Sequence, residues 1–155
     1  MNDYRIFAEH GLIVIWILGE AGVADLIRTI EEIIVDPAFS PDYDVICDFS
    51  GLVVDYTSDE IRWLGDFVVN LPKGTRRSRN AIVVTRTAAF GMGRMFEMMA
   101  ELTNPYEVMV VYSWVAALEW LGKDPKAIPA PGSDEWKRRS RDVRAGTTPS
   151  GGIRG

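Results

Sequence analysis

Residues 11–34, GLIVIWILGEAGVADLIRTIEEII, contain the change of hydrophobic period that decides the fold. The seven consecutive apolar residues from Leu12 to Leu18 predict a buried strand. From Val23 onward the apolar residues recur at helical spacing and the charged residues fall on the opposite side, which predicts an amphipathic helix. A buried strand followed closely by an amphipathic helix is typical of an α/β fold.

The sequence on either side predicts the remaining elements. Before this stretch, the β-rich run 4–8 is joined to 12–18 by a short connection containing Gly11, as in an antiparallel hairpin. After it, the hydrophobic pattern predicts strands at 43–49, 81–85 and 107–112, alternating with helices at 57–71, 88–102 and 113–121. The order ββαβαβαβα indicates an α/β domain with a mixed, largely parallel sheet.

Composition divides the chain near residue 122. Residues 1–122 have 9 basic and 18 acidic side chains, whereas residues 123–155 have 8 basic and 4 acidic ones and begin with a stretch rich in Pro and Gly. We therefore expect one α/β domain at 1–122, and a linker with a basic, partly disordered tail at 123–155. The acidic body argues against nucleic-acid binding, since contacts to phosphates supply most of that affinity.

The same composition favours a cytoplasmic protein. No apolar run approaches the roughly 20 residues needed to cross a bilayer, and the N-terminus lacks the layout of a signal peptide. The single cysteine, Cys47, lies in an apolar strand pattern and can form no internal disulfide.

The inventory of reactive side chains argues against an enzyme. The only histidine, His10, lies in a predicted turn, and Cys47 has no evident basic partner. Asp48 and Asp55, near the end of a predicted strand, suit either carboxylate chemistry or the capping of turns. No cluster of His and Cys supports a metal site. We expect no catalytic residues, no metal and no cofactor.

The strongest local signal is the segment 57–60, Thr-Ser-Asp-Glu, which has the form of a capping box. The Thr57 hydroxyl can accept a hydrogen bond from the N–H of Glu60, whose carboxylate reaches back to the N–H of Thr57. A helix is therefore expected to begin at Thr57 or Ser58.

Large apolar side chains also occur outside the core-facing stripes of two predicted helices. Trp63 and Phe67 depart from the stripe of the helix at 57–71, and Phe90 and Met98 lie away from the methionine-rich face of the helix at 88–102. If these four side chains are exposed and adjacent, they form an apolar surface for a partner protein, a lipid or a small ligand.

Two groups of basic residues have two interpretations. Solvated surface charge is the simpler one, and contact with an anionic membrane surface is the alternative. One group precedes the predicted strand at 81–85 and the other surrounds Trp136 in the tail: Lys73, Arg76, Arg77 and Arg79, and Lys137, Arg138, Arg139, Arg141 and Arg144.

The segment 43–52, YDVICDFSGL, together with DYTS at 55–58, resembles the STAS fold of bacterial anti-sigma-factor antagonists. The whole of residues 1–122, including AFGMGRMF at 89–96, is similar to the SpoIIAA-like group of small bacterial proteins, a STAS/SEC14-type group. In the phosphorylatable antagonists an Asp-Ser-Ser-Gly segment begins the second helix. Asp55 matches its aspartate and Thr57 its phospho-acceptor, but Tyr56 replaces the first serine and Ser58 the glycine.

The resemblance implies a non-enzymatic regulatory domain that binds a partner protein, with Asp55, Thr57 and Ser58 as the switch residues. It also implies an alternative, because SpoIIAA-like proteins are similar to SEC14-type lipid-binding domains. That alternative is the binding of an apolar small ligand or lipid, with association at a membrane surface, through Trp63, Phe67, Phe90 and Met98. Self-association, for example as a dimer through the same surface, is a third expectation.

Overall fold

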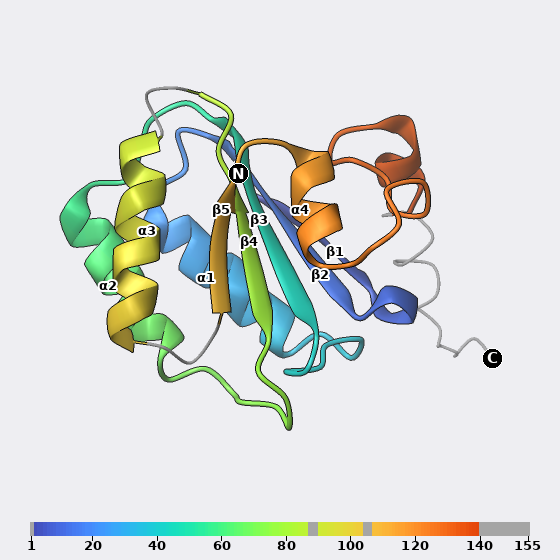
Figure 1. Cartoon of the computed structure of the whole chain (residues 1–155), viewed down its shortest axis with the longest axis horizontal. Helices are drawn as coiled ribbons and strands as arrows, with labels where there is room; N and C mark the ends of the chain where they lie inside the picture. The colour runs from blue at the N-terminus through green and yellow to red at the C-terminus, as the bar shows by residue number, and fades with distance from the viewer. Residues whose placement is uncertain (1, 87–89, 104–106, 140–155) are drawn as a thin grey trace.

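The computed structural model describes residues 2–86, 90–103 and 107–139. Within these residues, a five-stranded sheet has helices on both of its faces (Figure 1). The strands follow one another across the sheet in chain order, as β1 Asp3–Phe7, β2 Leu12–Gly19, β3 Asp44–Leu52, β4 Arg79–Val83 and β5 Glu107–Val111. The labelled helices are α1 Val23–Ile34, α2 Ser58–Val68, α3 Phe90–Thr103 and α4 Trp114–Trp120, with a 3-10 turn η1 at Ala8–His10. Residues 134–139 are also helical.

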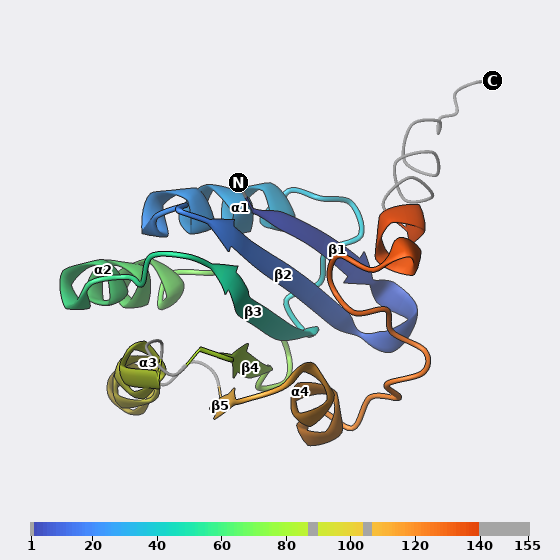
Figure 2. The ribbon, with the colours of Figure 1, turned by 90° about the horizontal axis from the view of Figure 1, so that it is seen from above.

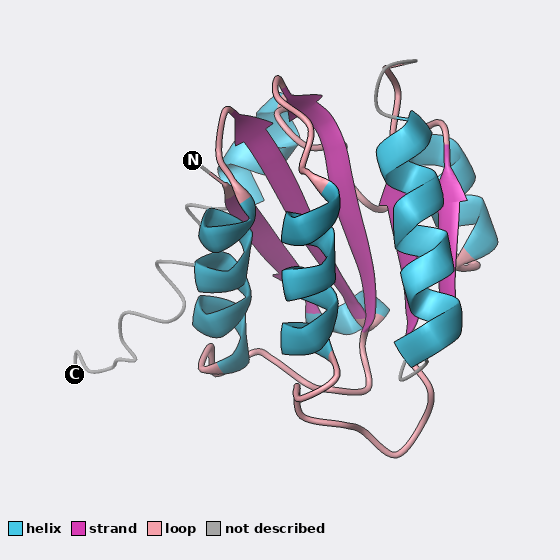
Figure 3. Cartoon of the chain, turned by 90° about the vertical axis from the view of Figure 1, so that its left-hand side faces the viewer, coloured by secondary structure: helices cyan, strands magenta, loops and turns pink. Residues whose placement is uncertain are grey.

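The pairing of the strands decides where the helices lie. β1 and β2 form an antiparallel hairpin, whereas β2, β3, β4 and β5 pair in parallel. The hairpin connection ends at Gly11, whose φ of 58° is a left-handed conformation that favours glycine. Each parallel pair requires a crossover, and α1, α2 and α3 supply these crossovers side by side on one face of the sheet (Figures 2 and 3).

Because successive side chains of a strand point to opposite faces of the sheet, each face has its own apolar core. Residues such as Ile13, Ile15 and Phe49 pack beneath α1, α2 and α3. Their neighbours Val14 and Ile46 point the other way, into a second core beneath α4. Because both faces are covered, β2 is apolar throughout its length, as expected for a central strand of such a sheet.

Residues 123–139 differ from the linker and tail expected from their composition. Ile128 and Trp136 are buried in the core beneath α4, and the segment runs beside α4 and the β1–β2 hairpin (Figure 1). The Trp136 indole N–H donates to Asp3 (3.1 Å), and the Arg5 guanidinium lies 4.4 Å from the centre of the Trp136 ring. This part of the chain therefore belongs to the folded domain. Residues 140–155, including Arg141 and Arg144, lie outside the described residues.

The predicted α/β class, with a mixed and largely parallel sheet, is confirmed. The helix predicted from Val23 begins at that residue. The boundaries of the strands are less accurate: β4 begins at Arg79 instead of residue 81, and β3 continues to Leu52 instead of ending at 49. In the part of the chain that the structure describes, no helix has the length and apolar character needed to cross a membrane.

Candidate functional site: an apolar pocket beneath α1 and α2

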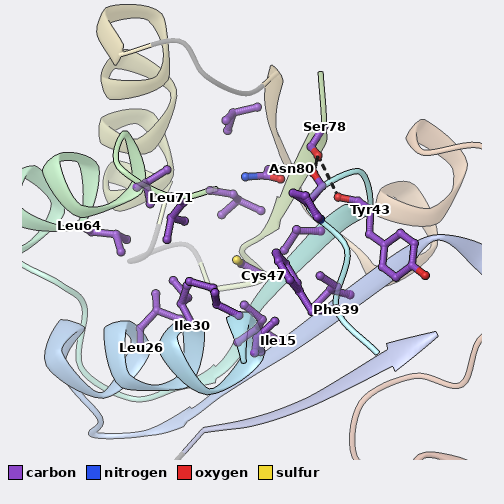
Figure 4. Close-up of a pocket in the computed structure, with 18 of the residues that line it drawn as sticks. Ile15, Leu26, Ile30, Phe39, Tyr43, Cys47, Leu64, Leu71, Ser78 and Asn80 are labelled. Atoms are coloured by element: carbon purple, nitrogen blue, oxygen red, sulfur yellow. Dashed lines mark hydrogen bonds between the residues drawn. The ribbon is translucent and has the colours of Figure 1, made fainter. Parts of the chain in front are cut away.

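A pocket of about 170 Å³ lies between the sheet and helices α1 and α2 (Figure 4). Leu26 and Ile30 of α1 face Leu64 of α2 across it, and Ile15 and Cys47 form part of its floor on the sheet. Its lining also includes Pro41 and the exposed Pro72, in the loops at the amino ends of β3 and β4. The pocket therefore has an opening at this end of the sheet.

The periodicity of the elements explains why the lining is apolar. Along β3, Val45, Cys47 and Phe49 are alternate residues and so share the face that points toward the helices. On α1, Leu26 and Ile30 are four residues apart and lie on one side of the helix. The pocket lining is therefore made by the apolar faces of these elements.

Asn80 is a polar residue in this lining whose side-chain oxygen has no hydrogen-bond partner. It lies on β4 between Val45 of β3 and Val108 of β5, which are its partners in the sheet. Its side-chain oxygen Oδ1 is buried and has no hydrogen-bond partner. By contrast, the nearby Ser78 hydroxyl is shared between the carbonyl oxygens of Pro41 and Tyr43, at 3.0 Å each.

Cys47 borders the pocket but is not placed as a nucleophile. Burial, together with a smaller effect of the Asp48 carboxylate, raises the pKa of the Cys47 thiol to about 12. The thiol is therefore protonated at neutral pH and behaves as a small apolar group. Asp48 points to the opposite face of the sheet, where burial raises the pKa of its carboxyl.

The loop between α2 and β4 borders the open end of the pocket. Oδ1 of Asp42 accepts from the backbone N–H groups of Thr75 (2.6 Å) and Arg76 (3.3 Å), and these bonds hold the pKa of Asp42 below its usual value. A Cβ at residue 74 would collide with the Asp42 carboxylate, so the turn requires Gly74. Asp42 thereby fixes the loop beside Pro41 and Pro72.

Three of the basic residues of this loop make separate contacts with neighbouring elements. Arg76 forms a salt bridge with the buried Asp44 (2.9 Å), and Lys73 donates to the carbonyl of Val69 at the end of α2 (2.8 Å). Arg79 turns to the other face, where it donates to the carbonyls of Trp120 and Leu121 (2.9 and 3.0 Å). Lys73, Arg76 and Arg79 therefore stabilise the ends of neighbouring elements.

In the tail, the buried Trp136 is likewise not exposed for a membrane contact. The burial of Trp136 therefore gives no support to the alternative in which this ring and the basic residues around it contact an anionic membrane surface.

The predicted switch residues lie at the opposite, carboxyl end of β3. The capping box is confirmed: Thr57 Oγ1 accepts from the N–H of Glu60 (3.2 Å), and Glu60 accepts from the N–H of Thr57 (2.8 Å). Thr57 and Ser58 are both exposed. Asp55 forms a salt bridge with Arg86, from the segment after β4. The structure thus brings a hydroxyl, a carboxylate and a guanidinium to one corner, away from the pocket opening.

The predicted apolar surface is only partly present. Trp63 and Met98 are 51% and 64% exposed, and Phe90 is 38% exposed with its ring 5.0 Å from that of Tyr112. Phe67 is half-buried and packs against the core beneath the helices. The expectation that Phe67 faces solvent is therefore wrong, because its side chain contacts the core beneath the helices.

Sequence reasoning did not identify the pocket or Asn80. A pocket arises from the distance between elements, which hydrophobic periodicity does not report. Alternation along the strand would have placed the polar Asn80 on the same face as Ile82 and Val84. The predicted strand began only at residue 81, so it did not include Asn80. No protein-family model matches the chain, and no curated protein matches it.

Proposed function

We propose that the chain is a non-enzymatic binding domain that holds a small apolar ligand in the pocket beneath α1 and α2. The observation that supports this proposal is the size and lining of the pocket. A volume of about 170 Å³ with an almost entirely apolar lining suits a small apolar ligand. Binding would remove apolar surface of both the ligand and the lining from water, which is favourable by about 25 cal/mol per Å².

The arrangement of the pocket suits a reversible ligand. Its walls come from two helices and the sheet, so the ligand site is built on regular elements. Pro41 and Pro72 leave the amino end open as a route of access. We include in the proposal that the fold is of the SpoIIAA-like, STAS/SEC14 type, since the resemblance to lipid-binding domains agrees with an apolar site beneath helices.

A thermal-shift experiment with toluene tests the proposal. Toluene is expected to raise the melting temperature of the wild-type chain in a saturable way, because it binds the folded state alone. Val68→Phe places a larger side chain in the lining and is expected to weaken toluene binding at least tenfold. Val35→Phe, at a residue that is 79% exposed, is the matched control and should bind toluene like wild type.

Two results would contradict this function. One is a melting temperature for wild type that does not respond to toluene. The other is equal binding of toluene by wild type and Val68→Phe, which would place the ligand elsewhere. Native mass spectrometry of the protein purified from cells adds a readout that needs no chosen probe, since a retained apolar ligand appears as a defined mass increment.

A second candidate function is partner binding at the start of α2. The observation that favours it is the exposed Thr57 hydroxyl beside the Asp55–Arg86 salt bridge. A phosphate on Thr57 would lie near the Arg86 guanidinium and could compete with Asp55 for it. In a pull-down, Thr57→Glu should change the proteins recovered, whereas Thr57→Ser, which keeps the cap, should not. Equal recovery by Thr57→Glu and wild type would rule out the switch.

Association with an anionic membrane surface is a variant of the ligand proposal. Trp63 and Met98 are the exposed apolar residues that favour it. Flotation with vesicles containing phosphatidylserine separates it from pocket binding alone, because Trp63→Ala should reduce flotation without changing toluene binding. If the wild-type protein does not float with the vesicles, membrane association is ruled out, and the proposal of ligand binding in the pocket is unaffected.

A further inference from the structure

The pocket has one feature that an entirely apolar ligand would not use. We infer that the ligand is a compact, uncharged ring or branched hydrocarbon with a single hydrogen-bonding group, and that Asn80 binds this group. The inference rests on the proposed function, since it specifies which apolar ligands the same pocket prefers. Asn80 would then determine the specificity and the orientation of the ligand.

The position of Asn80 supports this role. Val45 and Val108 flank it on the same face of the sheet, so no neighbouring strand offers its side chain a polar partner. Figure 4 shows the Asn80 side chain extending from the sheet toward the pocket, where Leu64 and Leu71 lie across the space. A buried polar atom without a hydrogen-bond partner, such as Oδ1 of Asn80, lowers the stability of the folded state. A ligand group that donates to this oxygen would remove that penalty.

The chemistry of the carboxamide defines the partner group. Asn has an oxygen that accepts and an NH₂ that donates, so it can pair with a hydroxyl, a carbonyl or an amide. A hydroxyl suits the unused Oδ1 directly, because it can donate to that oxygen. The group on the ligand must also lie at the β4 side of the pocket, with the apolar part directed toward α1 and α2.

The lining also limits the charge and size of the ligand. None of the described residues that line the pocket is Asp, Glu, Lys, Arg or His. An ionised ligand would lose its hydration without gaining a counter-charge, which is unfavourable. A cavity of 150 Å³ is known to hold benzene, so 170 Å³ suits a ligand of roughly six to ten heavy atoms.

Three probes of similar shape test the inference: toluene, p-cresol and p-toluate. Titration calorimetry at pH 7.5 should show p-cresol binding about fivefold more tightly than toluene, the gain typical of one net hydrogen bond. p-Toluate, which is ionised at this pH, should show no binding. Asn80→Leu should abolish the preference, so that toluene binds at least as tightly as p-cresol.

Asn70→Leu is the matched control, because Asn70 is exposed at the end of α2 and should leave all three affinities unchanged. A second measurement on wild type does not depend on the folding of a variant. The NMR signals of the Asn80 side-chain NH₂ should move on addition of p-cresol considerably more than on addition of toluene.

The outcomes separate this inference from the function on which it rests. If neither toluene nor p-cresol binds, the proposed function itself is overturned. If toluene binds wild type as tightly as p-cresol, the pocket is a ligand site but the assignment to Asn80 is overturned. If p-toluate binds as well as either, the restriction to uncharged ligands is overturned. An unchanged p-cresol preference in folded Asn80→Leu overturns it as well.

Discussion

At the scale of single residues, Cys47 and Asn80 differ in how far the sequence could predict them. An apolar strand pattern around Cys47 predicts a buried and unreactive thiol. Cys47 is half-buried at the edge of the pocket, and desolvation raises the pKa of its thiol, which agrees with low reactivity. Asn80 lines the same pocket, but its importance depends on its side-chain oxygen having no hydrogen-bond partner in the folded chain. Such an absence is a property of three-dimensional neighbours, so local sequence patterns could not reveal it.

The pKa of Cys47 leads to a prediction for its reactivity. The thiolate is the species that reacts, and with a pKa of about 12 its fraction at pH 8 is roughly 1000-fold smaller than for a free thiol. The rate of modification by N-ethylmaleimide in the native state should therefore rise about tenfold per pH unit from pH 7 to 10. In urea the same rate should level off above about pH 8.5, the usual thiol pKa. A native-state plateau below pH 9 would contradict the buried environment.

At the scale of elements, signals that act within a few residues were the most reliable. The capping box at Thr57 involves residues three apart and needs no tertiary contact, so the start of α2 was correctly predicted. The start of β4 was not, because Arg79 and Asn80 are polar and become strand residues through pairing with β3 and β5. Their strand conformation thus depends on neighbours that are distant in sequence.

Removal of the cap has a predicted cost. Thr57→Ala eliminates the acceptor for the N–H of Glu60 and should lower the free energy of unfolding by about 1 kcal/mol in urea denaturation. Thr57→Ser keeps an equivalent hydroxyl and should remain within about 0.5 kcal/mol of wild type. If both variants lose the same stability, the Thr57 methyl group and not the cap is responsible.

At the scale of the whole molecule, the limit of the domain was the main error of sequence reasoning. Pro, Gly and basic residues after Gly122 indicated a linker and tail, yet Ile128 and Trp136 are buried against the sheet. Composition averages over a segment, whereas one or two large apolar side chains are enough to anchor it. Arg5 of β1 also holds this segment in place. Its buried guanidinium contacts Asp3, the carbonyl of Trp136 and the Trp136 ring.

This anchoring predicts that Trp136 contributes strongly to the stability of the domain. Trp136→Ala removes a ring that is 1% exposed and that contacts Phe7, Trp16 and Arg5, so it should lower the free energy of unfolding by about 3–5 kcal/mol. Trp63→Ala is the matched control, since that ring is 51% exposed and its loss should cost no more than about 0.5 kcal/mol. Urea denaturation followed by circular dichroism measures both changes on one scale.

The contrast between these two variants distinguishes an anchored segment from an appended tail. If residues 123–139 were only loosely attached, Trp136→Ala would resemble Trp63→Ala, and truncation after Gly122 would leave the unfolding midpoint unchanged. If they complete the core beneath α4, truncation should be at least as destabilising as Trp136→Ala, because it also removes Ile128 and the Trp136 carbonyl that accepts from Arg5. If the truncated chain is as stable as wild type, residues 123–139 do not contribute to the core and the domain ends near residue 122.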